Sequence, residues 1–109
     1  MNAMTSIPWI AACSADDIAP EDVIRFDHDG RCFALYRTAD GRYFATDGLC
    51  THEQAALTDG LVTGTVIECP KHNGRFDFTT GKAIRRPACI DLKTYAVKLD
   101  AGTVFVRIE

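Results

Sequence analysis

Residues 31–36 read Arg-Cys-Phe-Ala-Leu-Tyr, and residues 103–108 read Thr-Val-Phe-Val-Arg-Ile. The side chains alternate in character through both stretches, which is the pattern of β-strands whose two faces lie in different surroundings. Strand-like runs of similar length recur between turn signals such as Asp40-Gly41 and Asp100-Ala101-Gly102. The sequence therefore predicts an all-β protein.

The strands and their spacing predict the architecture. We expect strands at 6–12, 22–26, 31–37, 42–46, 65–69, 75–78, 94–99 and 103–108, and one helical turn within 14–22, where Ser14 and Asp16 suit a helix N-cap. Short strands at this spacing favour an antiparallel sandwich or small barrel, so residues 1–109 are predicted to form a single domain. The segment 47–63 is too long for a hairpin turn and lacks helical periodicity. Long irregular loops in small domains usually carry function.

Composition narrows the class of protein. Hydrophobic residues make up 47% of the chain, which is enough for a packed core. The net charge is −3 and the sequence pI is about 5.5, which argues against a nucleic-acid-binding protein because those need a basic face. Neither a positively charged leader nor an apolar membrane-spanning stretch is found, so we expect a cytoplasmic protein with no membrane partner. Its five cysteines are then expected as thiols or ligands.

Two short motifs carry the chemistry. Cys50-Thr51-His52 lies in the long segment, and Cys69-Pro70-Lys71-His72 follows a predicted strand. Each motif offers one thiolate and one imidazole, a set of donors that suits a transition metal. Three interpretations are open: unrelated buried cysteines and turn histidines, a structural zinc site, or a [2Fe–2S] cluster with two Cys and two His ligands. Zinc fingers usually present a Cys pair and then a His pair, whereas Cys and His alternate here.

The two motifs resemble the cluster-binding boxes of Rieske-type ferredoxins, over Asp47-Gly48-Leu49-Cys50-Thr51-His52 and Cys69-Pro70-Lys71-His72-Asn73-Gly74-Arg75-Phe76-Asp77. The resemblance extends over nearly the whole chain. It implies one Rieske [2Fe–2S] cluster held by Cys50, His52, Cys69 and His72, in a subdomain built from two loops at about 47–87. The most similar members are ferredoxins of bacterial Rieske non-haem iron oxygenase systems, including those of rhizopine catabolism.

One residue departs from the family pattern. The family usually has glycine directly after the second ligating histidine, whereas this chain has Asn73 followed by Gly74. Asparagine is among the few residues that tolerate left-handed backbone. We therefore expect Asn73 to preserve the shape of the loop.

The resemblance implies a soluble one-electron carrier rather than an enzyme. Such a monomer passes electrons from a flavoprotein reductase to a Rieske-type oxygenase (dioxygenase, monooxygenase or demethylase), docking transiently near His52 and His72. A catalytic oxygenase subunit also needs an iron held by two His and a carboxylate, but His28 is the only histidine outside the two motifs. The alternatives are a small subunit of an assimilatory nitrite reductase and, more remotely, a zinc-stabilised interaction domain.

A low reduction potential is expected from residues that the chain lacks. High-potential Rieske proteins resemble it in both boxes but add a disulfide between the loops, at the positions of Ala55 and Lys71 here. They also carry Ser and Tyr hydroxyls that donate to cluster sulfurs, at the positions of Gly74 and Phe76. Hydrogen bonds to the sulfurs favour the reduced state. Their absence predicts a value towards the low end of the Rieske range.

The remaining candidate residues are expected to play minor roles. Three cysteines lie outside the motifs and are predicted to be packing residues, and His28 is predicted to lie solvated in a turn. A few charged residues near the boxes are candidates for partner contact. The residues are Cys13, Cys32 and Cys89 for packing, and Glu53, Arg85 and Arg86 for contact.

Overall fold

The computed structural model describes residues 7–51, 54–71, 73–86, 88 and 90–108. These ranges contain strands and two short 3₁₀ helices, and no helix within them could span a membrane. In chain order the elements are β1 (Ile10–Ser14), η2 (Ala15–Asp17), β2 (Asp22–His28), β3 (Arg31–Arg37), β4 (Tyr43–Asp47), η3 (Leu57–Asp59), β5 (Leu61–Thr63), β6 (Val66–Glu68), β7 (Arg75–Asp77), β8 (Lys82–Arg85), β9 (Thr94–Asp100) and β10 (Thr103–Arg107).

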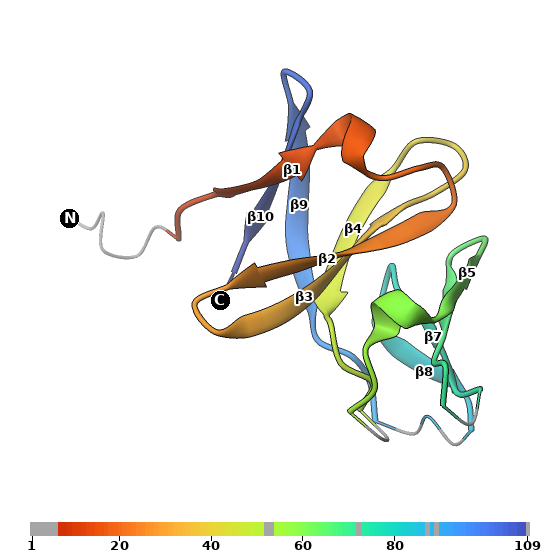
Figure 1. Ribbon diagram of the computed structural model, residues 1–109. Helices are drawn as coiled ribbons and strands as arrows, with labels where there is room; N and C mark the ends of the chain where they lie inside the picture. The colour runs from red at the N-terminus through yellow and green to blue at the C-terminus, as the bar shows by residue number, and fades with distance from the viewer. Residues whose placement is uncertain (1–6, 52–53, 72, 87, 89, 109) are drawn as a thin grey trace.

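The strands form two antiparallel sheets, so the all-β prediction is confirmed (Figure 1). The larger sheet has the order β1-β10-β9-β4-β3-β2 and curls into a nearly closed barrel. The smaller sheet has the order β5-β6-β7-β8 and lies between β4 and β9 in the chain. Because β4 and β9 are neighbours in the large sheet, the small sheet is an insertion that leaves the barrel and returns beside its point of departure.

β3 is central because both of its faces are buried. Phe33 and Leu35 point into the barrel, where they pack with Ile18, Ala45 and Val106. Ala34 and Tyr36 point the other way and belong to the cluster that fills the space against the small sheet. Alternate side chains of β3 thus enter two different apolar clusters, and neither face of this strand is open to solvent.

Tight hairpins set the register of the large sheet. β2 pairs with β3 without a shift from Asp22↔Arg37 to His28↔Arg31. Asp29 and Gly30 form the turn between them with φ of +51° and +75°. Two consecutive left-handed residues are the geometry of the two-residue turns that match strand twist. The turn between β2 and β3 is therefore a two-residue hairpin turn of Asp29 and Gly30.

The predicted helical turn is a 3₁₀ helix closed by a capping box. The Ser14 hydroxyl accepts a hydrogen bond from the Asp16 amide, and the Asp17 carboxylate accepts one from the Ser14 amide at 2.9 Å. Ser14 is thus the N-cap, as its side chain predicts.

The prediction that 47–63 is an irregular loop was only partly right. This segment contains η3, the strand β5 and an isolated bridge between Leu49 and Ala56. The prediction also missed β8, which follows Gly81. Both strands are only three or four residues long, which is too short to show a clear period in sequence, and pairing with β6 and β7 decides their conformation.

Side chains of both sheets meet in one interior. The rings of Tyr36 and Phe78 stack with centroids 4.2 Å apart and planes 1° from parallel. The Tyr36 hydroxyl lies 2.8 Å from the Thr46 hydroxyl, so its one polar atom has a partner in this buried position. At the surface, the Glu21 carboxylate accepts a hydrogen bond from the Gly64 amide in the β5–β6 turn.

Candidate metal centre

The two cysteines of the predicted ligand set lie where the chain leaves the sheets. Cys50 comes shortly after β4, and Cys69 comes directly after β6. Both residues are only 1% exposed. Although they are far apart in the sequence, both belong to the buried cluster that also contains Ile67 and Phe76.

The two loops that begin at these cysteines share one backbone design. The Cys50 amide donates to the carbonyl of Ala55 at 2.7 Å, and the Cys69 amide donates to the carbonyl of Gly74 at 2.7 Å. In each loop the hydrogen bond therefore reaches the carbonyl five residues later. The residue just before that carbonyl has left-handed backbone in both loops, with φ of +59° at Gln54 and +60° at Asn73. Each cysteine thus lies at the base of an equivalent closed loop.

This geometry confirms one expectation and adds a residue that sequence reasoning missed. Asn73 adopts left-handed backbone, so asparagine does keep the turn at this position. Gln54 was missed because glutamine has no preference for that conformation. The available signal is spacing, since both residues come four positions after a motif cysteine.

The two histidines of the predicted set, His52 and His72, lie outside the described residues, as do Glu53, Pro87 and Cys89. By chain position each histidine falls inside one of the two closed loops. Among the residues that are described, no group of three His, Cys, Asp or Glu side chains forms a metal site. The described part contributes two buried thiols, each at the base of a loop that also contains a histidine, and this donor set suits a transition metal.

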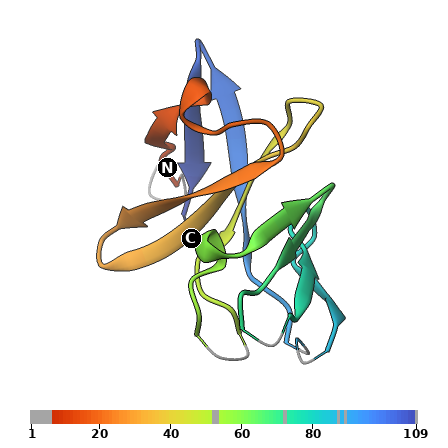
Figure 2. The same cartoon turned by 45° about the vertical axis from the view of Figure 1, so that its right-hand side comes forward.

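A third segment, whose described residues are 86, 88 and 90–92, lies beside the two loops. The Thr51 hydroxyl donates to the carbonyl of Ile90 at 2.7 Å and so joins this segment to the first loop. Ala88 contacts the second loop so closely that a Cβ added to Gly74 would lie 3.0 Å from its Cβ and its amide nitrogen. Figure 2 shows the described parts of the three segments together at the end of the small sheet. The apolar side chains of Leu49 and Ile90 remain exposed there.

A network of polar side chains holds the start of the first loop. The Tyr95 hydroxyl donates to the Asp47 carboxylate at 2.5 Å and accepts from the Arg31 guanidinium at 2.7 Å. Burial, followed by the interactions with Asp47, raises the pKa of Tyr95 to about 12. The phenol therefore stays protonated near neutral pH and can serve as the donor. This network joins strands β3 and β9 to the last residue of β4.

The other candidate residues lie away from the two loops or at their margin. Cys13 lies in β1, and Cys32 lies in β3 with its sulfur against Gly48, where an added Cβ would come within 2.4 Å. Burial raises the pKa of both thiols, which makes them poor nucleophiles. His28 is the last residue of β2 rather than a solvated turn residue. Its ring stacks on Phe26, and its Nε2 lies 3.4 Å from the Asp29 carboxylate.

Comparison with known proteins assigns this arrangement to one family of domains. The family described as "Rieske [2Fe-2S] domain" matches residues 8–96. The ferredoxin component of the naphthalene 1,2-dioxygenase/salicylate 5-hydroxylase systems of Ralstonia sp is 46% identical over 101 residues, covering 93% of this chain and 96% of the relative.

Solved structures share the same architecture. A chain from the complex of reduced oxygenase and oxidised ferredoxin in carbazole 1,9a-dioxygenase superposes with a TM-score of 0.87 at 35% identity, covering 94% of each chain. A chain named as the small subunit of an NADH-dependent nitrite reductase from Mycobacterium tuberculosis gives a TM-score of 0.83 at 20% identity, covering 95% of this chain and 98% of that one. The second likeness shows the fold alone.

Proposed function

This chain belongs to the Rieske [2Fe–2S] domain family, and from that premise we propose that it is the electron-carrying ferredoxin of a Rieske dioxygenase system. The observation that supports the carrier role most directly is the 46% identity over almost the full length of a ferredoxin component. That relative is named as the ferredoxin component of its systems rather than as a catalytic subunit. The chain therefore works with an oxygenase and performs no substrate chemistry of its own.

Cys50, His52, Cys69 and His72 are the ligands in this proposal. The equivalent loops support it, because each begins with a buried cysteine and contains one histidine by chain position. When bound, the Rieske cluster supplies a centre that takes up and releases one electron. The residues around it exclude water from the thiolate side and hold both loops by backbone hydrogen bonds, so the protein needs little rearrangement between the two charge states.

Partners follow from the same premise. A flavoprotein reductase is the proposed electron donor and a Rieske-type oxygenase the acceptor, both docking near His52 and His72. The complex of an oxygenase with a ferredoxin of 35% identity supports the acceptor side. The nitrite reductase alternative receives less support, because the likeness to such a subunit is at 20% identity. Family membership leaves the zinc-stabilised interaction domain without support.

Residues 1–109 act as one domain in this proposal. One cluster of buried side chains supports this, because it contains residues from both sheets, including Ala34, Tyr36, Ile67 and Phe76. The small sheet could not bury its inner face without the barrel.

Reconstituted electron transfer tests the carrier role. We expect cluster-loaded protein to support product formation by the oxygenase component of the naphthalene 1,2-dioxygenase system with its reductase, in proportion to the amount of carrier added. Without the carrier, turnover should fall to the background level. Product formation is measured by chromatography under limiting carrier. Wild-type protein that is reduced by the reductase but passes no electron to the oxygenase would contradict the proposal.

The reduction potential is a separate prediction. We expect a midpoint near the low end of the Rieske range, roughly −150 mV, because neither Gly74 nor Phe76 has a side-chain hydroxyl that could donate a hydrogen bond to a sulfur. Both residues are buried in the small sheet or its loop. Gly74→Ser should raise the midpoint by adding a hydroxyl donor, and protein-film voltammetry near pH 7 measures the change.

The matched control is Gly74→Ala, which adds the same Cβ without the hydroxyl. Both substitutions require Ala88 to move by a few tenths of an ångström, since the added Cβ would lie 3.0 Å from it. A rise with serine but not with alanine therefore isolates the hydrogen bond from the crowding. A wild-type midpoint well above zero would contradict the low-potential assignment.

A further inference from the structure

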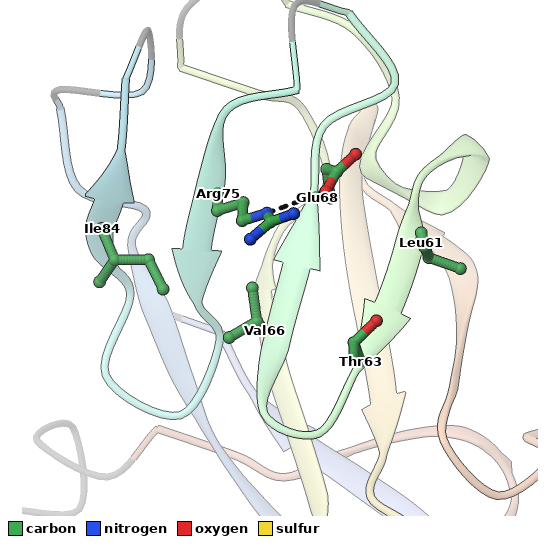
Figure 3. A pocket seen from close by; sticks show the side chains of 6 residues that line it. All are labelled: Leu61, Thr63, Val66, Glu68, Arg75 and Ile84. Carbon is green, nitrogen blue, oxygen red and sulfur yellow. Dashed lines mark hydrogen bonds and ion pairs between the residues drawn. The ribbon is translucent and has the colours of Figure 1, made fainter.

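The outer face of the small sheet contains a pocket with an apolar lining (Figure 3). Leu61, Val66 and Ile84 line it from β5, β6 and β8, and the ion pair between Glu68 and Arg75 closes the end nearest the loops. Its volume is about 210 Å³. Leu61 is 62% exposed and Ile84 is 50% exposed. Large aliphatic side chains left open on an ordered strand are typical of contact surfaces when they gather around a hollow.

This pocket adjoins the loops of the metal centre through adjacent residues. Glu68 directly precedes Cys69, and Arg75 directly follows Gly74, whose carbonyl accepts the Cys69 amide. Arg85 lies opposite Arg75 in the β7–β8 pairing and comes next after Ile84. The loops and the pocket therefore form one continuous surface, and a partner that covers the loops can also contact the pocket.

Three cations border the pocket and the loops, and we name them the basic rim: Lys71, Arg85 and Arg86. All three are exposed. None of them forms an ion pair with any residue that the structure describes. Lys71 belongs to the second loop. Arg85 and Arg86 lead into the third segment, where the Arg85 carbonyl accepts the Ala88 amide.

Within residues 68–91, the three carboxylates, all of them described, accept hydrogen bonds from neighbouring groups. Glu68 accepts from Arg75 at 2.9 Å, Asp77 accepts from the amide and hydroxyl of Thr79, and Asp91 accepts from the amide of Ala83. The donors to Asp77 and Asp91 are neutral, so these carboxylates keep their charge, but residues 68–91 contain five cations and three carboxylates and are net positive, although the chain as a whole carries −3. A chain with a net negative charge that keeps exposed cations beside its cluster-binding loops is suited to an acidic partner surface there.

We propose that the basic rim and the adjoining pocket are a contact area for the oxygenase, filled by an oxygenase surface that presents carboxylates around one aliphatic side chain. The assignment rests on the proposed function, which supplies the oxygenase as partner. The carboxylates of the oxygenase pair with Arg85 and Arg86 and align the two proteins. The aliphatic side chain of the oxygenase enters the pocket between Leu61 and Ile84. The two cluster-binding loops then face the acceptor in one orientation rather than several. Contacts on one side of these loops prevent the carrier from rotating against the oxygenase surface.

Charge reversal at the rim tests this proposal. Arg85→Glu and Arg86→Glu are compared with Lys98→Glu, which makes the same change in net charge on the barrel, where Lys98 lies over the ring of Trp9. At low salt each rim variant should raise the carrier concentration for half-maximal oxygenase turnover by about tenfold, and Lys98→Glu should not. The difference should shrink at high salt, where charges are screened. Maximal turnover and the visible spectrum should stay as in wild type.

A second variant tests the pocket. Ile84→Asn places an uncharged polar side chain at the pocket wall on an exposed position and should weaken the oxygenase interaction by a similar factor at every salt concentration, with the visible spectrum unchanged. The rate of carrier reduction by the reductase is measured for every variant. An effect confined to that step would overturn the assignment to the oxygenase.

The outcomes separate the two proposals. Wild-type carrier that gives no oxygenase turnover would overturn the proposed function and this surface with it. Full wild-type turnover, with rim and Ile84 variants that behave like Lys98→Glu, would overturn the surface alone.

Discussion

Replacing Cys50 or Cys69 with serine is expected to abolish the red-brown colour of the protein and its bound iron. Both cysteines lie at the base of equivalent loops and are only 1% exposed. A side chain at the surface therefore cannot take the place of the lost thiolate as a ligand. His52→Ala and His72→Ala should remove or convert the cluster. Iron and acid-labile sulfide analysis should give about two of each per wild-type chain, and the reduced protein should show the electron paramagnetic resonance signal of mixed His and Cys ligation.

The control for this series is Cys32→Ser. Its sulfur is half-buried in β3 and packs against Gly48 outside both loops, so the change costs packing but should leave the spectrum intact. Cys13→Ser and Cys89→Ser are expected to behave in the same way. Loss of the cluster from one of these variants with the fold retained would show that the ligands are misassigned. Stoichiometric zinc in protein expressed with ample iron would also refute the assignment.

Gly81→Ala is expected to be the most destabilising conservative change in the small sheet. Gly81 has a φ of +82°, and a Cβ there would lie 2.1 Å from the carbonyl oxygen of Leu92. The Gly81 carbonyl also accepts the Leu92 amide at 2.7 Å, so the two backbones cannot separate without losing that bond. We expect a loss of about 3 kcal/mol or more, because left-handed strain and a backbone clash add.

Gly102→Ala is a matched control, because Gly102 has a φ of +81° and nothing lies within 4 Å of its added Cβ. It should cost only the left-handed penalty, about 1 kcal/mol. The two variants therefore differ in sterics alone. Urea denaturation followed by circular dichroism on cluster-loaded protein compares them. Equal midpoints for the two variants would mean that Leu92 moves away at no cost and would contradict the prediction.

The barrel strands were largely predictable because their periodicity is long enough to read. β3 begins and ends at the predicted residues, and β2, β4, β9 and β10 differ from prediction by one or two residues at one or both ends. The prediction for β1 was less accurate, since a strand expected at 6–12 runs from Ile10 to Ser14. Seven-residue strands such as β3 show several alternations. A strand of three residues such as β5 shows barely one, and its conformation comes from hydrogen bonds to β6.

The motif residues and their chemistry were determined by the sequence itself, because Cys and His are rare and their spacing is specific. The turn at Asn73 could also be inferred from the residue type. The matching turn at Gln54 could not, because glutamine does not favour left-handed backbone, and only the structure shows the hydrogen bond from the Cys50 amide to the Ala55 carbonyl that closes this loop.

Which charges stay exposed near the two loops was likewise decided by tertiary structure. Residues 68–91 carry five cations (Lys71, Arg75, Lys82, Arg85 and Arg86) and three carboxylates (Glu68, Asp77 and Asp91), so their net charge of +2 is already evident in the sequence. In the fold each of those three carboxylates accepts a hydrogen bond from a neighbouring side chain or amide, whereas Lys71, Arg85 and Arg86 stay exposed. The sequence by itself determines which donors and charges the chain carries. The tertiary structure decides which of them are used up inside the molecule and which remain for a partner, because hydrogen bonds and ion pairs depend on distances that only folding sets.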